Sequence, residues 1–81
     1  MKVNVLFFSV LRDLFGTDSL ELELDAGASL ADLVATLQTR FPGLVAWQGR
    51  LLLAVNGEYA DGTTVLGGGD EIALMPPVQG G

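Results

Sequence analysis

The sequence predicts an α+β domain in which a mixed sheet of about five strands carries one main helix across one face. Leu20 to Leu24, LELEL, alternates strictly between apolar and acidic residues, which indicates a strand with its glutamates in water. Residues 30–40 repeat apolar side chains at the spacing of one helical face. Asn56-Gly57 is a strong hairpin signal, so strands also follow the helix.

The first elements are a strand and a short helix. Lys2 to Phe8, KVNVLFF, has apolar residues at nearly every position and predicts a central strand covered on both faces. Ser9 stands at an N-cap position and Gly16 just past a last turn, so we expect a short helical segment between them.

The main helix is predicted from about Leu30 to Arg40. Ser29 and Asp32, three residues apart, resemble a capping box at its start. Pro42 disfavours helix at Phe41 and therefore ends it. The irregular stretch that follows contains Trp47, which we expect to cap the core.

The second half of the chain predicts three strands. Arg50 to Val55 indicates a buried strand, a short strand around Glu58 and Tyr59 pairs back onto it, and Glu71 to Met75 forms the last one. Two hairpin-like halves joined through one helix place the first and last strands side by side, which is a β-grasp arrangement. We expect the domain to span residues 1–75 and an extended tail to span residues 76–81.

The composition limits the possible functions. The chain has 81 residues, a formal charge of -6, no cysteine and no histidine. One core fits this length, and the acidic balance argues against nucleic acid as a partner. The commonest general base and the best side-chain nucleophile are both missing, so an ordinary side chain is not expected to perform catalysis. The apolar start is too short and too polar for a membrane span, which predicts a cytoplasmic protein without a membrane partner.

Two acidic or glycine-rich stretches have simpler explanations than a site. Residues 67–71, GGGDE, lack the Lys-Ser/Thr pair of a phosphate loop, so a turn is the better interpretation. Asp61, Asp70 and Glu71 lack the ligand spacing of a calcium loop, and we expect solvated turn carboxylates and no metal site. Arg12 either pairs with a carboxylate of a partner or lies over apolar surface.

The predicted sheet leaves one face open. Alternation turns one set of apolar side chains toward the helix, namely Val3, Val5, Phe7, Ile72 and Leu74. It turns another set away, namely Leu6, Phe8, Ala73 and Met75. With Tyr59 nearby, this second set forms an apolar patch typical of a protein interface, unless loops fold over it.

The chain ends in MPPVQGG, residues 75–81. Pro76 and Pro77 remove two backbone donors and restrict the chain to an extended path, so the segment is expected to leave the sheet. Six extended residues span roughly 20 Å. A tail of this kind, with Val78 and Gln79 gripped by a partner and Gly80 adding no width, could present a terminal carboxylate at a distant site. Acyl chemistry at that carboxylate would require activation, most simply as a mixed anhydride with AMP.

Three stretches resemble the MoaD family, the small sulfur-carrying subunits of molybdopterin synthase. They are VLFFSVLRDLFG, LLLAVNGE and GDEIALMPPVQGG, and the Pro-Pro-Val-x-Gly-Gly ending is the specific one. The resemblance implies that Gly81 is adenylated by an ATP-dependent, ubiquitin-activating-like adenylyltransferase and converted to a thiocarboxylate. A desulfurase or rhodanese system supplies the sulfur, no cofactor is bound permanently, and the large subunit accepts the tail. The sulfur then goes to a cyclic pterin precursor.

The resemblance also assigns partner contacts. Phe8, Tyr59 and Met75 fall where the family places apolar contacts, although Met75 replaces a more usual phenylalanine and Tyr59 a more usual aliphatic residue. In this interpretation the chain donates sulfur and supplies no catalytic side chain. The alternatives are a carrier for thiamin, cysteine or tRNA thiolation, a protein modifier that forms isopeptide bonds, and an interaction module that is never activated.

Overall fold

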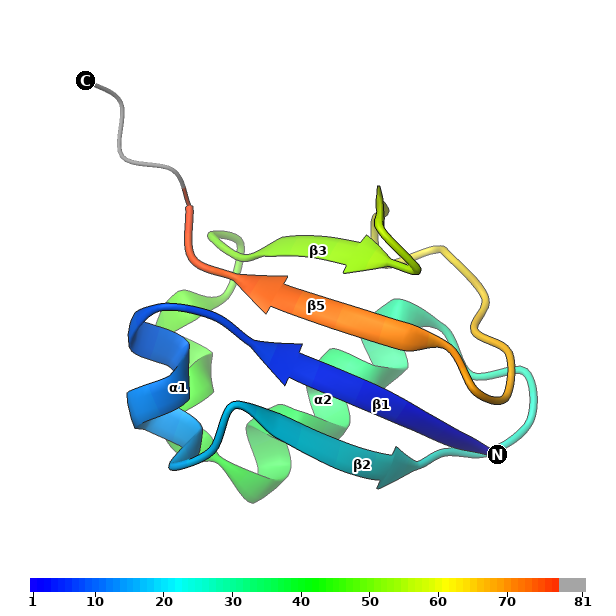
Figure 1. The fold of residues 1–81 in the computed structure, drawn as a ribbon, viewed down its shortest axis with the longest axis horizontal. Helices are drawn as coiled ribbons and strands as arrows, with labels where there is room; N and C mark the ends of the chain where they lie inside the picture. Colours follow the sequence, from blue (N-terminus) through cyan, green and yellow to red (C-terminus); the bar gives the residue numbers. More distant parts are fainter. Residues whose placement is uncertain (78–81) are drawn as a thin grey trace.

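The computed structural model describes residues 1–77 of the chain. Its elements in chain order are β1 (Lys2–Phe7), α1 (Val10–Phe15), β2 (Ser19–Glu23), α2 (Leu30–Arg40), the 3-10 helix η1 (Pro42–Trp47), β3 (Leu52–Val55), β4 (Glu58–Tyr59) and β5 (Glu71–Met75). Figure 1 shows α2 lying across one face of the sheet, with α1 at the edge where β1 and β5 end.

The five strands form one mixed sheet in the order β2-β1-β5-β3-β4. β1 and β5 are parallel neighbours at its centre, and the other three pairs are antiparallel. The predicted adjacency of the first and last strands is therefore confirmed. The predicted mixed sheet with one main helix across one face is confirmed as well.

The core lies between the sheet and α2. The five side chains predicted to face the helix are all fully or almost fully buried: Val3, Val5, Phe7, Ile72 and Leu74. From α2, Leu30, Leu33 and Leu37 are completely buried and meet them. Burying an aliphatic or aromatic side chain of this size stabilises a fold by about 1.5–3 kcal/mol, so this layer supplies most of the driving force.

The capping box and the end of α2 match the prediction. The backbone nitrogen of Ser29 donates to Asp32 Oδ2 at 2.9 Å, and the backbone nitrogen of Asp32 donates to Ser29 Oγ at 3.2 Å. Phe41 is the C-cap, and its backbone nitrogen donates to the Leu37 carbonyl at 2.7 Å. Both ends of the helix are thus set by residues visible in the sequence.

The prediction that the first strand is covered on both faces is wrong. Lys2 and Asn4 are exposed and Leu6 is only half-buried, because the described chain has one helical layer and it covers the other face. Strand boundaries also differ by one or two residues. β1 ends at Phe7, β2 covers residues 19–23, and β3 begins at Leu52.

The stretch after α2 is helical, where the sequence predicted an irregular segment. Pro42 occupies the first turn of η1, a position that needs no backbone donor. Gly43 permits close contact with α1, because a Cβ there would lie 2.7 Å from Leu14 Cδ1. Trp47 packs half-buried against the core, and Arg50 Cζ lies 5.0 Å from the centre of its ring.

The chain reverses between β1 and α1 through a strained residue. Ser9 has φ 57° and ψ -133°, and its side chain makes no capping hydrogen bond. It is at the predicted N-cap position but works only through its backbone. Aromatic packing joins the two sides of the reversal: the Phe7 and Phe15 rings stack with centroids 3.8 Å apart, and Phe41 meets Phe15 edge-on at 4.6 Å.

Replacing Ser9 by glycine should stabilise the domain. A non-glycine residue at this positive φ costs about 1–3 kcal/mol, and the greater freedom of glycine in the unfolded chain offsets up to about 1 kcal/mol of the gain. We expect the melting temperature of Ser9→Gly to rise by several degrees, measured by circular dichroism.

Asn56→Gly is the matched control. Asn56 also has a positive φ, 51°, but its side chain makes hydrogen bonds to Asp70 and Glu71 that glycine would lose. The control should therefore melt at a lower temperature than the parent chain. A lower melting temperature for Ser9→Gly would show that the serine side chain stabilises this reversal.

Candidate interaction site on the open sheet face

An apolar patch lies on the sheet face that α2 leaves open. We call it the open-face patch, and it lines a shallow hollow of about 260 Å³ formed by Phe8, Ala54, Gly57, Tyr59, Ala73 and Met75. The register explains the grouping, because Ala54 pairs with both Tyr59 and Ala73 across neighbouring strands. Directly paired residues of antiparallel strands point to the same face of a sheet.

Small residues form the floor of the patch and large ones its rim. Ala54 is 7% exposed, whereas Phe8 is 44% exposed and Tyr59 is 76% exposed. The alternative interpretation expected loops to fold over this face, but no loop among residues 1–77 covers it. A concave apolar surface with aromatic rim residues is suited to receive an apolar side chain of a partner.

Two lining residues were not predicted. Ala54 and Gly57 complete the hollow, and the prediction took its residues from the first and last strands and from Tyr59 alone. The signal was present, because the hairpin turn at Asn56-Gly57 sets Ala54 opposite Tyr59.

The hairpin that carries Tyr59 is fixed by its turn and by a side-chain bridge. Asn56 and Gly57 have φ of 51° and 86°, the conformation expected for an Asn-Gly hairpin. Asn56 Nδ2 donates to Asp70 Oδ1 at 2.9 Å, and the backbone nitrogen of Glu71 donates to Asn56 Oδ1 at 2.9 Å. The position of Tyr59 therefore depends on the loop that precedes β5.

The carboxylates of Asp61 and Asp70 accept hydrogen bonds from residues of their own turns. The backbone nitrogen of Gly67 donates to Asp70 Oδ2 at 2.7 Å, and this bond together with the Asn56 amide lowers the pKa of Asp70. The hydroxyl and backbone nitrogen of Thr63 both donate to Asp61 Oδ1 and lower the pKa of Asp61. Residues 67–71 thus form the turn that was predicted, closed by Asp70.

Arg12 lies in α1 at the edge of the open face. It lines a second shallow hollow, of about 310 Å³, together with Leu6 and Phe8. Within residues 1–77 the one ion pair joins Lys2 and Glu21 at 3.7 Å, so Arg12 is exposed without a carboxylate partner in the described part of the chain. Its predicted role in binding a partner stays a prediction.

The last strand ends beside the open-face patch. β5 stops at Met75, and Pro76 and Pro77 follow half-buried without extending the ladder. The predicted site residues Val78, Gln79, Gly80 and Gly81 lie outside the described residues. The described part of the tail therefore begins at the same sheet edge as Phe8.

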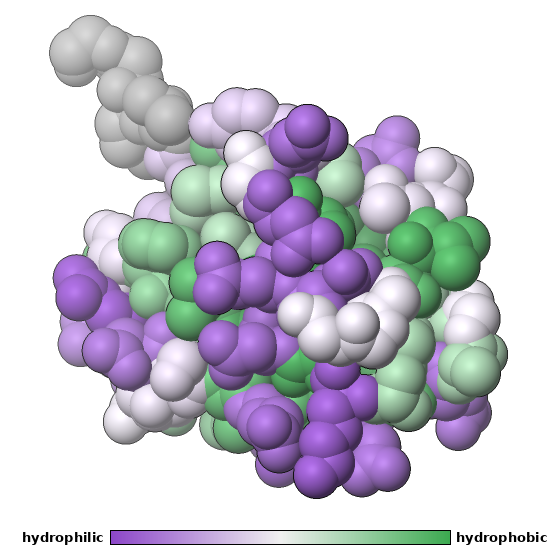
Figure 2. All heavy atoms as spheres, turned by 45° about the vertical axis from the view of Figure 1, so that its right-hand side comes forward, coloured by the Kyte–Doolittle hydropathy of each residue, from purple (hydrophilic) through white to green (hydrophobic). Residues whose placement is uncertain are grey.

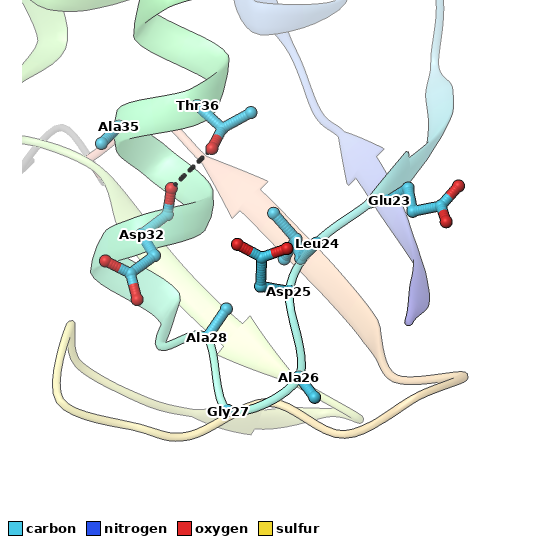
Figure 3. A pocket seen from close by; sticks show the side chains of 9 residues that line it. All are labelled: Glu23, Leu24, Asp25, Ala26, Gly27, Ala28, Asp32, Ala35 and Thr36. Atoms are coloured by element: carbon cyan, nitrogen blue, oxygen red, sulfur yellow. Dashed lines mark hydrogen bonds between the residues drawn. The ribbon is translucent and has the colours of Figure 1, made fainter.

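A larger hollow lies at the other end of the domain. It measures about 580 Å³ and is lined by the loop after β2 and the first turns of α2 (Figure 3). Asp32 on its wall already serves the capping box, and the Glu23 carboxylate points away from it. Its acidic groups have structural roles or face water, so we assign it no function.

The described residues contain no helix long and apolar enough to span a bilayer.

Comparison with known proteins identifies the family. The ThiS family model matches residues 5–81. The chain belongs to the ThiS family. A curated relative, the molybdopterin synthase sulfur carrier subunit of Mycobacterium tuberculosis, is 42% identical over 82 residues and covers 100% of this chain and 99% of its own length. Relatives of the same name occur in eukaryotes, including Homo sapiens.

Solved structures share the fold over the full chain. SAMP1 from Haloferax volcanii superposes with a TM-score of 0.89 at 26% identity and full coverage of both chains. The complex of subunits 1 and 2 of the molybdopterin-converting factor from Helicobacter pylori contains a chain that matches with a TM-score of 0.74 at 34% identity, again with full coverage of both chains. The predicted β-grasp fold and the resemblance to sulfur carriers are therefore confirmed.

Acid should selectively weaken the contribution of Asp70 to stability. Its pKa is lowered in the folded chain, so its stabilising effect is present above the unfolded value of 3.8 and is lost as the pH falls through the folded value. We expect Asp70→Asn to melt below the parent chain at neutral pH and the difference to shrink below pH 3.8. A difference that does not change with pH would show that the charge is unimportant.

Proposed function

We propose that this chain is the sulfur carrier subunit of a molybdopterin synthase, with the sulfur held as a thiocarboxylate on Gly81. The observation that carries the proposal is the placement of the open-face patch beside the start of the Pro-Pro-Val-Gln-Gly-Gly tail. One partner surface could therefore hold the domain by the patch and receive the tail. The family match and the names of the curated relatives support this function.

The proposed chemistry uses the terminal carbonyl and no side chain of the domain. An adenylyltransferase would transfer AMP from ATP to the Gly81 carboxylate, and a desulfurase or rhodanese system would supply the sulfur that displaces AMP. The large subunit would then hold the thiocarboxylate against a cyclic pterin precursor. Glycine at the last two positions keeps the chain narrow and the carbonyl accessible to attack.

The patch is the proposed contact with the large subunit. In the Helicobacter pylori structure, a chain of this fold is part of a complex of two subunits of the molybdopterin-converting factor, which supports a large-subunit partner. Phe8, Tyr59 and Met75 are the proposed anchors because they form the rim and the tail-side wall of the hollow. Arg12 would add a polar contact at its edge. A cytoplasmic location stays a prediction of the sequence.

A protein modifier is the second candidate. The chain shares its fold with proteins named small archaeal modifier protein 1, which supports an activated terminus that ends on a lysine of another protein. Mass spectrometry of the chain co-expressed with its activating enzyme discriminates the two. A thiocarboxylate favours the carrier, lysine conjugates favour the modifier, and an unchanged carboxylate favours a module that is never activated.

Removing Gly80 and Gly81 should abolish sulfur transfer without unfolding the domain. The core, β5 and the open-face patch all lie within residues 1–77, so the truncated chain should melt at the temperature of the parent. Mass spectrometry should find no thiocarboxylate, and synthesis of dithiolene from the precursor should stop. A large fall in melting temperature would contradict a purely functional role for these two residues.

Phe8→Ala should weaken binding of the large subunit more than it disturbs folding. Removing an aromatic anchor from an interface often costs about 2 kcal/mol or more, which is roughly a thirtyfold loss of affinity. Calorimetric titration of the large subunit with the parent chain and with Phe8→Ala measures this loss of affinity. Val65→Ala is the matched control, because Val65 is 67% exposed and outside the patch, and its binding should not change. Equal binding by Phe8→Ala would remove the patch as the contact surface.

A further inference from the structure

The chain is almost without side chains that attack activated acyl groups. It has no cysteine and no histidine, and its four cationic side chains are Lys2, Arg12, Arg40 and Arg50. Only the lysine offers an amine, because the arginine guanidinium stays protonated and is no nucleophile in water. The sequence therefore contains a single side-chain amine, that of Lys2.

That amine lies at the end of the sheet opposite to the tail. Lys2 begins β1, and its carbonyl accepts a hydrogen bond of 2.7 Å from the backbone nitrogen of Gly69, just before β5. Its side chain pairs with Glu21 at 3.7 Å. Figure 2 brings this end forward and shows hydrophilic side chains interspersed with apolar ones. From the level of Gly69 to Met75 the sheet extends roughly 20 Å, at about 3.3 Å per residue.

Arginine occupies the end from which the tail departs. Leu52, the first residue of β3, pairs with Met75, the last residue of β5, and Arg50 lies in the turn two residues before β3, at the end of the sheet where β5 ends. It is held there by the hydrogen bond from its Nη2 to the Ala46 carbonyl at 2.8 Å and by the Trp47 ring. Arg12 follows the parallel strand β1 and reaches the same edge.

We propose that Arg50 is a specificity-determining residue, which supplies positive charge at the end of the sheet from which the tail departs without offering an amine to the activated terminus. This inference rests on the proposed function, since it concerns the Gly81 adenylate. Without an amine at this end of the sheet, the Gly81 adenylate reacts with the sulfur donor and does not form an amide with a side chain of its own domain.

The reaction that arginine avoids is amide formation. A neutral lysine Nζ beside the tail would attack the Gly81 carbonyl, form a C–N bond and break the bond from that carbon to the phosphate oxygen. AMP would leave with the electron pair, and the amine proton would pass to water. From residue 77, four extended residues span at most about 14 Å, so a lysine at position 50 would face a tethered acyl group at millimolar effective concentration.

The test introduces an amine at either end of the sheet. Arg50→Lys keeps the charge and places an amine beside the tail, whereas Ala26→Lys places one on the exposed loop after β2, at the same end as Lys2 (Figure 3). Each chain is incubated with the activating enzyme and ATP, without a sulfur donor, at about pH 8.5 to raise the share of neutral lysine. Mass spectrometry measures the cyclic amide, which is lighter than the free acid by one water, and peptide mapping locates it.

We expect Arg50→Lys to form the cyclic amide roughly tenfold or more faster than Ala26→Lys. The parent chain, whose amines are Lys2 and the α-amine of Met1 at the end where Ala26 lies, should form it no faster than Ala26→Lys. Equal amounts from the two variants would overturn the inference. The same chains prepared with a C-terminal thioester measure acceptor reactivity without the enzyme, the thiol leaving in place of AMP. If no chain is adenylated, the proposed function fails, and the thioester comparison still decides the inference about Arg50 in the same direction.

Discussion

Parallel pairing of β1 with β5 brings the ends of the first and last strands to one edge of the sheet. The chain that leaves β1 passes through Phe8 into α1, and the chain that leaves β5 passes through Met75 into Pro76 and Pro77. An aromatic rim, an exposed arginine and the start of the tail therefore come together without any long loop. If either strand ran the other way, Phe8 and Met75 would lie at opposite ends of the domain.

Local rules predicted the elements whose ends carry their own signals. α2 was predicted at its observed bounds because the Ser29 and Asp32 side chains satisfy its first donors and Pro42 prevents its continuation. The Asn56-Gly57 hairpin was predicted for a similar reason, since few residue pairs accept two positive φ angles in succession. In both cases the residues that decide the structure are neighbours in the sequence.

Features that depend on distant contacts were missed. Nothing local marks Ser9 for a positive φ, and the chain reversal at this residue accompanies the stacking of Phe7 on Phe15. The helical turn of η1 needs the close approach of Gly43 to Leu14. The first strand looked doubly covered because apolar residues such as Leu6 and Phe8 serve an open face, and sequence alone does not distinguish a covered apolar face from an exposed one. Alternation and the hairpin signal were enough to place Phe8, Tyr59 and Met75 on one face, whereas the pairing of Ala54 with Ala73 needed the register between β3 and β5.

The place of β5 in the sheet also has a mechanical consequence. A partner that grips the chain beyond Met75 pulls along the axis of a strand bonded on both sides, to β1 and to β3. Pulling along this axis loads the hydrogen bonds of both ladders together in shear, whereas an edge strand pulled sideways would lose its bonds one at a time. Traction on the tail is therefore spread over the centre of the sheet, and the domain can be drawn against a partner without being unravelled from its end.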